Sequence, residues 1–261
     1  WRDEKITEIK EHIKNGSVKK VVLARELVLS AEKDFQISDI LAKLSIQNKS
    51  SMIFNIDGFL GASPELLIKR SGNSVTSHPL AGTAPKFHDS DSDEISRQKL
   101  LDSTKDAYEH RVTIEWLLNE LLPFCSYIDA DPEPKIVSLE HVHHLGTEVA
   151  GQLSTPACSI LELVNALHPT PAVGGDPQTE ALAIIKRVEG IDRRRYAGPV
   201  GWMAADGDGE FAVGIRSAEV KANTARLFAG VGLVEDSDPQ SELEETEAKF
   251  KTMLNTFLST T

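Results

Sequence analysis

Residues 198–234, GPVGWMAADGDGEFAVGIRSAEVKANTARLFAGVGLV, are the stretch from which the fold class can be predicted. Alternating runs of apolar and small residues are separated by two turn signals, "DGDG" and "ANT". Such a pattern is typical of consecutive antiparallel strands joined by tight turns. We therefore expect three strands here, and an antiparallel sheet as the centre of the fold.

Within this stretch, Arg216 occupies an unusual place. The alternation in EFAVGIRSAEV places it on the same face as Ala212 and Gly214. A guanidinium among small residues has room to bind a carboxylate with two hydrogen bonds. A structural salt bridge is an equally good interpretation of this pattern.

A second predicted strand, in residues 16–27 (GSVKKVVLAREL), begins with two adjacent lysines. Successive side chains of a strand point to opposite faces, so Lys19 and Lys20 cannot share an environment. One of them is expected to face inward. Solvated strand-end lysines are the ordinary interpretation, because lysine is almost never buried without a partner.

Composition limits what the chain can bind. The 261 residues include 40 Asp and Glu but only 28 Lys and Arg, which gives a net charge of -12. A nucleic acid backbone would be repelled on average, so we expect no nucleic acid partner, and any anionic ligand must be held by local cations. No apolar run is long enough to span a membrane, and we expect no membrane partner.

Two further features concern the cellular context and the ends of the chain. Cys125 and Cys158 form no CxxC motif, which fits core thiols in a reducing cytoplasm. The chain begins with Trp1 rather than Met, and we expect it to be a piece of a longer protein. Residues 1–261 contain no repeat or linker, so a single domain is predicted.

The remaining periodic segments predict an α+β fold. We expect helices at 1–16, 37–48, 92–123, 159–168, 177–188 and 237–258. Strands are expected at 52–63, 65–80 and, as one long strand, 135–154.

Two of these helices carry acidic residues at helical spacing. Glu242, Glu245 and Lys249 are three and four residues apart, and Asp106 and Glu109 are three apart in the long helix. Two helices could thus present acidic pairs to one space, and Mg²⁺ commonly takes one or two carboxylates together with waters and substrate oxygens. A solvated helix face would show the same spacing.

Several smaller signals carry little weight alone. Gly230 and Gly232 precede the acidic helix, and Gly82 and Thr83 lie in HPLAGTAP, where bare amides could approach a carboxylate. The HVHH run at 141–144 suggests zinc, but no cysteine or HExxH ligand set accompanies it. Histidines that line a polar pocket are the better interpretation.

Ten motifs then occur in one order along the chain: KKVVLAREL, GASPELL, HPLAGTAP, KDAYEH, HHLGTEVAG, HPTPAVGG, YAGPVGW, GIRSA, AGVGLV and DPQSELEETEAK. Over almost its whole length the chain resembles the catalytic core of the chorismate-utilising enzymes. Within that group it is similar to isochorismate synthases of the menaquinone or catecholate-siderophore type. The resemblance implies a large antiparallel sheet sandwich flanked by helices, to which family members add residues before this core.

The resemblance also implies roles for particular residues. Lys20 matches the general base that activates the attacking water, and Lys19 would then face outward. Glu65 in SPELL matches the general acid that protonates the departing 4-hydroxyl of chorismate. Glu109 and Glu245 would bind Mg²⁺ directly.

Other matched positions would complete the metal and substrate sites. Asp106 and Glu242 would be nearby acids that hold waters of the metal ion. The implied substrate-binding residues are Gly82, Thr83, His144, Ala172, Tyr196, Arg216, Gly230, Gly232 and Lys249.

The reaction within the family depends on few positions. Ala81 occupies the place of a nucleophilic lysine in one type of aminodeoxychorismate synthase, and Ala172 the place of a threonine in amino-transferring and pyruvate-eliminating relatives. Both favour isochorismate formation from chorismate. Separately, we expect the protein to be a monomer. A salicylate synthase and a non-catalytic chorismate-binding core remain the alternatives.

Overall fold

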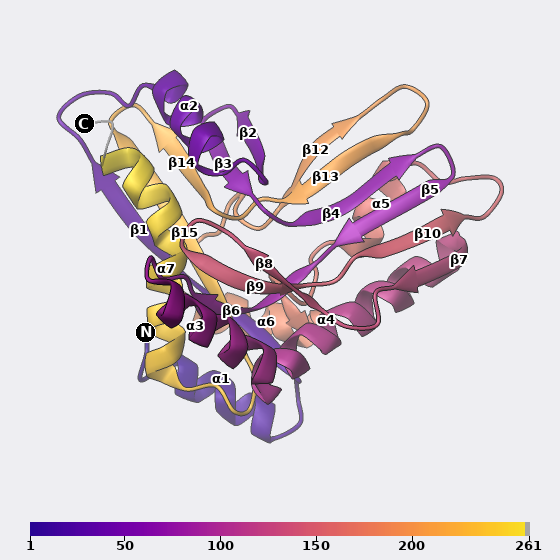
Figure 1. Ribbon diagram of the computed structural model, residues 1–261, viewed down its shortest axis with the longest axis horizontal. Coiled ribbons are helices and arrows are strands. Elements are labelled where there is room, and N and C mark those ends of the chain that lie inside the picture. The colour runs from indigo at the N-terminus through magenta and orange to yellow at the C-terminus, as the bar shows by residue number, and fades with distance from the viewer. Residues whose placement is uncertain (259–261) are drawn as a thin grey trace.

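Three antiparallel sheets make up the β-structure of residues 1–258, which are the residues that the computed structural model describes (Figure 1). Sheet A has the order β11 (Gly175–Asp176), β1 (Lys20–Ser30), β15 (Thr224–Leu233), β14 (Ser217–Lys221), β3 (Phe59–Ser63), β2 (Met52–Ile56). Sheet B has the order β12 (Pro199–Met203), β13 (Gly209–Val213), β4 (Leu66–Ser71), β5 (Ser74–His78), β10 (Val149–Leu153), β7 (Cys125–Ala130). Sheet C is β6 (Leu80–Pro85), β9 (Val142–Gly146), β8 (Lys135–Ser138).

Helices cover these sheets, and the predicted combination of antiparallel sheets with flanking helices is confirmed. The α-helices are α1 (Lys5–Lys14), α2 (Ile37–Gln47), α3 (Ser90–Asp102), α4 (Thr104–Leu121), α5 (Ile160–Leu167), α6 (Gln178–Val188) and α7 (Pro239–Leu258), and a short 3-10 helix covers Leu122–Phe124. One apolar core joins sheet B to α4 and α5, and two more join sheet A to α1 with α6 and to α2 with α7.

The first long strand has two different faces. Val21 and Leu23 pack with α1 and α6, while Lys20 and Val22 point to the opposite side of sheet A. The Lys20 side chain is 0% exposed, whereas Lys19 is 63% exposed and pairs with Asp176 at 3.1 Å. The inward and outward assignment of the two lysines is therefore confirmed.

The prediction of a single helix at 92–123 is wrong. The chain leaves helical geometry at Ser103 (φ -74°, ψ 109°), so α3 and α4 are separate helices. The Ser103 hydroxyl accepts a hydrogen bond from the Asp106 amide at 3.1 Å and caps α4. The apolar periodicity continued across the break and hid this cap.

Two strand predictions also need correction. The expected strand at 135–154 is three strands, because turns at 139–141 and 147–148 fold β8 onto β9 and direct β10 into sheet B. Residues 198–234 form four strands rather than three. The chain leaves sheet B at Val213 and enters sheet A at Ser217, so the alternation does not continue to Arg216.

Cys125 and Cys158 are free and partly buried at the edge of the core beneath sheet B. None of the helices within residues 1–258 combines the length and the apolar character needed to cross a bilayer. The expectation of a single domain stays a prediction.

Candidate active site

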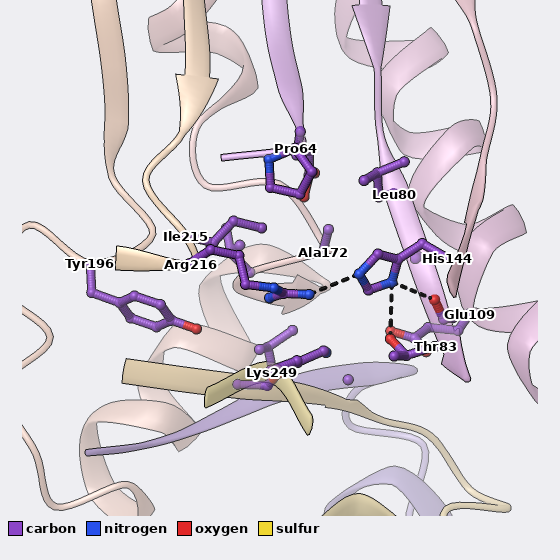
Figure 2. A pocket seen from close by; sticks show the side chains of 17 residues that line it. Pro64, Leu80, Thr83, Glu109, His144, Ala172, Tyr196, Ile215, Arg216 and Lys249 are labelled. Carbon is purple, nitrogen blue, oxygen red and sulfur yellow. Dashed lines mark hydrogen bonds between the residues drawn. The ribbon is translucent and has the colours of Figure 1, made fainter. Parts of the chain in front are cut away.

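A small cavity of about 40 Å³ lies where β1 and β15 of sheet A approach β6 and β9 of sheet C (Figure 2). Helices α4 and α7 and four connecting loops complete its wall. It is lined by Val22, Pro64, Glu65, Leu80, Ala81, Gly82, Thr83, Glu109, His144, Ala172, Val173, Tyr196, Ile215, Arg216, Gly230, Gly232 and Lys249. Most of the residues implied by the resemblance are thus brought together, although their motifs are far apart in the chain.

Lys20 lies at the start of β1, directly behind this lining. Its Nζ is 2.9 Å from Glu109 Oε1 and 3.4 Å from the Thr113 hydroxyl. Gly232, opposite Val22 in β15, leaves the space for this pair. A Cβ at Gly232 would lie 2.0 Å from Glu109 Oε1 and 2.8 Å from Lys20 Cε.

Glu65 follows β3 and is 3% exposed. Burial raises the pKa of its carboxyl from 4.5 to about 7, although the charges of Lys20 and Arg216 oppose the rise. A carboxyl with this pKa holds a proton near neutral pH and can donate it.

Arg216 reaches the cavity from the crossover between the sheets, where its backbone is left-handed (φ 49°). Its Nη2 donates to His144 Nε2 at 2.8 Å, and His144 Nδ1 lies 2.9 Å from the Gly82 carbonyl oxygen (Figure 2). Burial, reinforced by Arg216, lowers the pKa of His144 well below its ordinary value. His144 is therefore neutral, with its proton on Nδ1, and it orients Arg216.

The Arg216 guanidinium keeps one unused donor. Its Nε is buried and has no hydrogen-bond partner in residues 1–258. An unsatisfied buried donor on a cation costs free energy, and an anionic ligand would relieve that cost. Arg216 is thus suited to binding a carboxylate.

Two more donors lie at the floor of the cavity. Lys249 Nζ donates to the Gly230 carbonyl oxygen at 2.9 Å and also pairs with Glu245. Burial raises the pKa of Tyr196 to about 12, so its phenol stays protonated and can donate a hydrogen bond. A Cβ at Gly230 would lie 3.1 Å from this hydroxyl oxygen, which shows how closely Tyr196 approaches β15.

Four carboxylates, Asp106, Glu109, Glu242 and Glu245, gather between the first two turns of α4 and of α7. Burial raises the pKa of Asp106, and Glu109 and Glu245 raise it further. Burial and then Glu245 likewise raise the pKa of Glu242. Burial would also raise the pKa of Glu245, but Lys249 and Lys105 lower it overall. Mutual repulsion of this kind favours a bound cation.

The carboxylate oxygens are suitable ligands for a metal ion. Glu242 Oε2 is buried and makes no hydrogen bond of acceptable geometry, although the Ser237 side chain lies close enough to lower the pKa of Glu242. Oxygen ligands from carboxylates are those that Mg²⁺ prefers. Within residues 1–258, no three His, Cys, Asp or Glu side chains already converge on one point, because lysines face three of the carboxylates.

Asp106 and the HVHH run take specific places. Asp106 accepts a hydrogen bond from the Thr83 amide at 3.3 Å and contacts Gly82. His143 lies between the Ser138 hydroxyl (2.9 Å) and Asp93 (2.8 Å), and only His144 of the run lines the cavity. One histidine of HVHH is therefore a pocket residue, and its neighbour joins α3 to sheet C.

Sequence reasoning missed two groups of residues. Lys105 forms an ion pair with Glu242 at 2.6 Å. The two residues lie in different helices, so no regular spacing in the sequence could have indicated this contact. The apolar lining was also missed, namely Val22, Pro64, Leu80, Val173 and Ile215. For Val22 a signal existed, because strand alternation places it on the face of Lys20.

Comparison with known proteins agrees with this geometry. The sequence pattern of the family described as "Chorismate binding enzyme" matches residues 1–258. Isochorismate synthase MenF of Bacillus subtilis is 42% identical over 247 residues, which are 93% of this chain and 52% of that protein. Isochorismate synthase DhbC of the same organism is 40% identical over 253 residues, with 93% and 64% covered.

A solved structure gives the same result. The chain matches a Bacillus anthracis structure described as a 2,3-dihydroxybenzoate-specific isochorismate synthase, DhbC, with a TM-score of 0.93 and 41% identity. The match covers 99% of this chain and 71% of that one. This chain spans between half and two thirds of the length of the two curated relatives. Since the family pattern covers residues 1–258 and the solved fold is the same, this chain belongs to the chorismate binding enzyme family.

Proposed function

We propose that this chain is an isochorismate synthase, which converts chorismate to isochorismate with water added at C2 and the hydroxyl lost from C4. The observation that carries the proposal is the presence, at one cavity, of a fully buried lysine, Lys20, and a buried carboxyl, Glu65, that holds its proton to about pH 7. Similarity to proteins named isochorismate synthase supports the same reaction.

Lys20 and Glu65 supply the proton transfers. As the general base, Lys20 takes a proton from a water as its oxygen bonds to C2, and Glu65 gives its proton to the C4 oxygen as the C4–O bond breaks. The products are isochorismate and water, with Lys20 protonated and Glu65 ionised. A proton must pass from Lys20 to Glu65, directly or through solvent, before the next turnover.

The carboxylates of chorismate would bind to the cations of the cavity. Arg216, oriented by His144, offers its unpaired Nε, and Lys249 and the Tyr196 hydroxyl lie at the floor. The Gly82 and Gly232 amides permit close approach, since neither residue has a side chain. Desolvation by the apolar lining strengthens each of these charge contacts.

We propose Mg²⁺ as the cofactor. Glu109 and Glu245 would hold it directly, and Asp106 and Glu242 would hold its waters. When bound, the ion would neutralise a substrate carboxylate and fix its orientation. The repulsion among the four carboxylates and the unpartnered Glu242 Oε2 support this assignment.

Two other functions make different predictions in one assay. A salicylate synthase would also eliminate pyruvate, and a non-catalytic core would bind chorismate without converting it. Ala81 and Ala172, both in the cavity wall, favour isochorismate formation through the resemblance described above. Incubation with chorismate and Mg²⁺ should yield isochorismate without salicylate or pyruvate.

The products of that assay decide between the functions. Equal amounts of salicylate and pyruvate would replace the proposal with a salicylate synthase. Binding of chorismate with no product, from a folded chain, would indicate a non-catalytic core.

A further inference from the structure

Lys105 has no role in the chemistry proposed above, yet it lies against the carboxylate cluster. It is the second residue of α4, and its Nζ is 2.6 Å from Glu242 Oε1. The Glu242 side chain is 1% exposed and the Lys105 side chain 22%. At this burial little water screens the attraction between the two charges.

The other two lysines at the cluster have different surroundings. Lys20 pairs with Glu109 and Lys249 with Glu245, and both belong to the proposed catalytic and substrate-binding groups. Lys105 instead lines a separate cleft of about 800 Å³ together with Lys19, Tyr108, Arg111, Glu235 and Asp236. It therefore lies between the cluster and this cleft.

Charge balance gives Lys105 a function in the absence of a metal ion. Four carboxylates crowd the first two turns of α4 and of α7, and Glu242 and Glu245 are neighbours on α7. Without Lys105, the Glu242 carboxyl would lose the ion-pair partner of one oxygen, while its other oxygen already makes no hydrogen bond of acceptable geometry. Removing one member of a buried pair is strongly unfavourable.

The same ion pair opposes metal binding. A divalent cation near Glu242 must share this carboxylate with the Lys105 ammonium or displace it, and like charges at such distances repel. We propose that Lys105 is a positioning residue that acts as a resident counter-cation: it holds Glu242 in the metal-free protein and weakens Mg²⁺ binding by competing for that carboxylate. This inference rests on the proposed Mg²⁺ site.

Calorimetric titration of the folded chain with MgCl₂ alone tests the competition without any activity measurement. Lys105→Met removes the charge and the hydrogen bond, and should tighten Mg²⁺ binding about tenfold, the order expected for loss of one nearby charge. Lys105→Gln keeps an N–H donor for Glu242, so it allows the test even if Lys105→Met fails to fold. It should tighten Mg²⁺ binding to a similar extent. Lys105→Arg should bind Mg²⁺ like the parent.

Lys19→Met is the matched control. Lys19 lines the same cleft but pairs with Asp176, outside the cluster, so its loss should change the Mg²⁺ dissociation constant less than twofold. A purely structural role for Lys105 predicts weaker or unchanged binding in the Met and Gln variants. Either result overturns the competition.

The parent titration separates this inference from the metal assignment. If the parent binds Mg²⁺ and both neutral variants bind it equally well, only the competition fails. If the parent shows no binding but Lys105→Gln does, the competition is supported in a stronger form. If none of the proteins binds Mg²⁺, the metal site itself is wrong and the inference falls with it.

Discussion

The proposed general acid should make the folded protein less stable at neutral and alkaline pH. Folded Glu65 keeps its proton to about pH 7, whereas an exposed glutamate in the unfolded chain releases it near 4.5. Between these values the folded state binds more protons, so the free energy of unfolding falls as the pH rises through this window. The interval corresponds to roughly 3 kcal/mol at about 1.4 kcal/mol per pH unit.

Glu65→Gln removes this loss, because glutamine does not ionise. The stability of the variant relative to the parent should therefore improve by roughly 2 to 3 kcal/mol between about pH 5 and about pH 8, while isochorismate formation is lost. The comparison uses the change with pH, so any constant difference between a neutral glutamate and glutamine cancels. Urea denaturation of both proteins at several pH values measures it.

Glu235→Gln serves as the control, because Glu235 is exposed and its replacement should leave the dependence on pH as in the parent. A stability difference between Glu65→Gln and the parent that stays constant with pH would refute the reasoning. So would a difference that moves in favour of the parent as the pH rises. Either result would mean that Glu65 does not carry a proton in the folded protein near neutral pH.

Three further predictions concern the same cavity. Lys20→Gln should lower the turnover rate by roughly 10² to 10⁴ through loss of the base, whereas Lys19→Gln on the opposite strand face should stay within a few-fold of the parent; equal losses would contradict the assigned faces. Glu109→Gln and Glu245→Gln should each abolish Mg²⁺-dependent turnover, and near-normal rates at saturating Mg²⁺ would exclude direct ligation. Gly232→Ala should separate Lys20 from Glu109, since the new Cβ would lie 2.0 Å from Glu109 Oε1; a loss of activity with roughly 1 to 3 kcal/mol of stability, by rate and by urea denaturation, is expected, and parent-like values would argue against this packing.

Local periodicity was sufficient for the parts of the fold that depend on one segment. The motif resemblance identified Lys20 as the inward lysine. The two-residue alternation of a strand required that Lys19 then face outward, and the structure agrees. Helical spacing placed Glu242 and Glu245 on one face of α7, and the structure buries Glu242 fully and Glu245 partly. Such features follow from backbone geometry alone.

Features that depend on pairing between distant segments could not be predicted in this way. The ion pair of Lys105 with Glu242 joins α4 to α7, and no spacing within either helix indicates it. Arg216 was expected to reach its site by strand alternation, but it does so from a break where the chain changes sheets. The motif resemblance supplied Glu242 and Arg216 but not Lys105, and it gave no geometry that brings them together.

The crossover at 214–216 both connects two sheets and positions a ligand-binding side chain. A Cβ at Gly214 would lie 2.8 Å from the Gly198 carbonyl oxygen, so there is no space for a side chain here. The Arg216 carbonyl oxygen accepts a hydrogen bond from the Ala62 amide at 3.1 Å, which joins the segment to β3. The same residues direct the guanidinium to His144. A substitution here should therefore lower both the stability of the fold and the binding of the ligand. In a saturation mutagenesis survey, this tripeptide should tolerate fewer replacements than equally buried positions in the cores that serve packing alone.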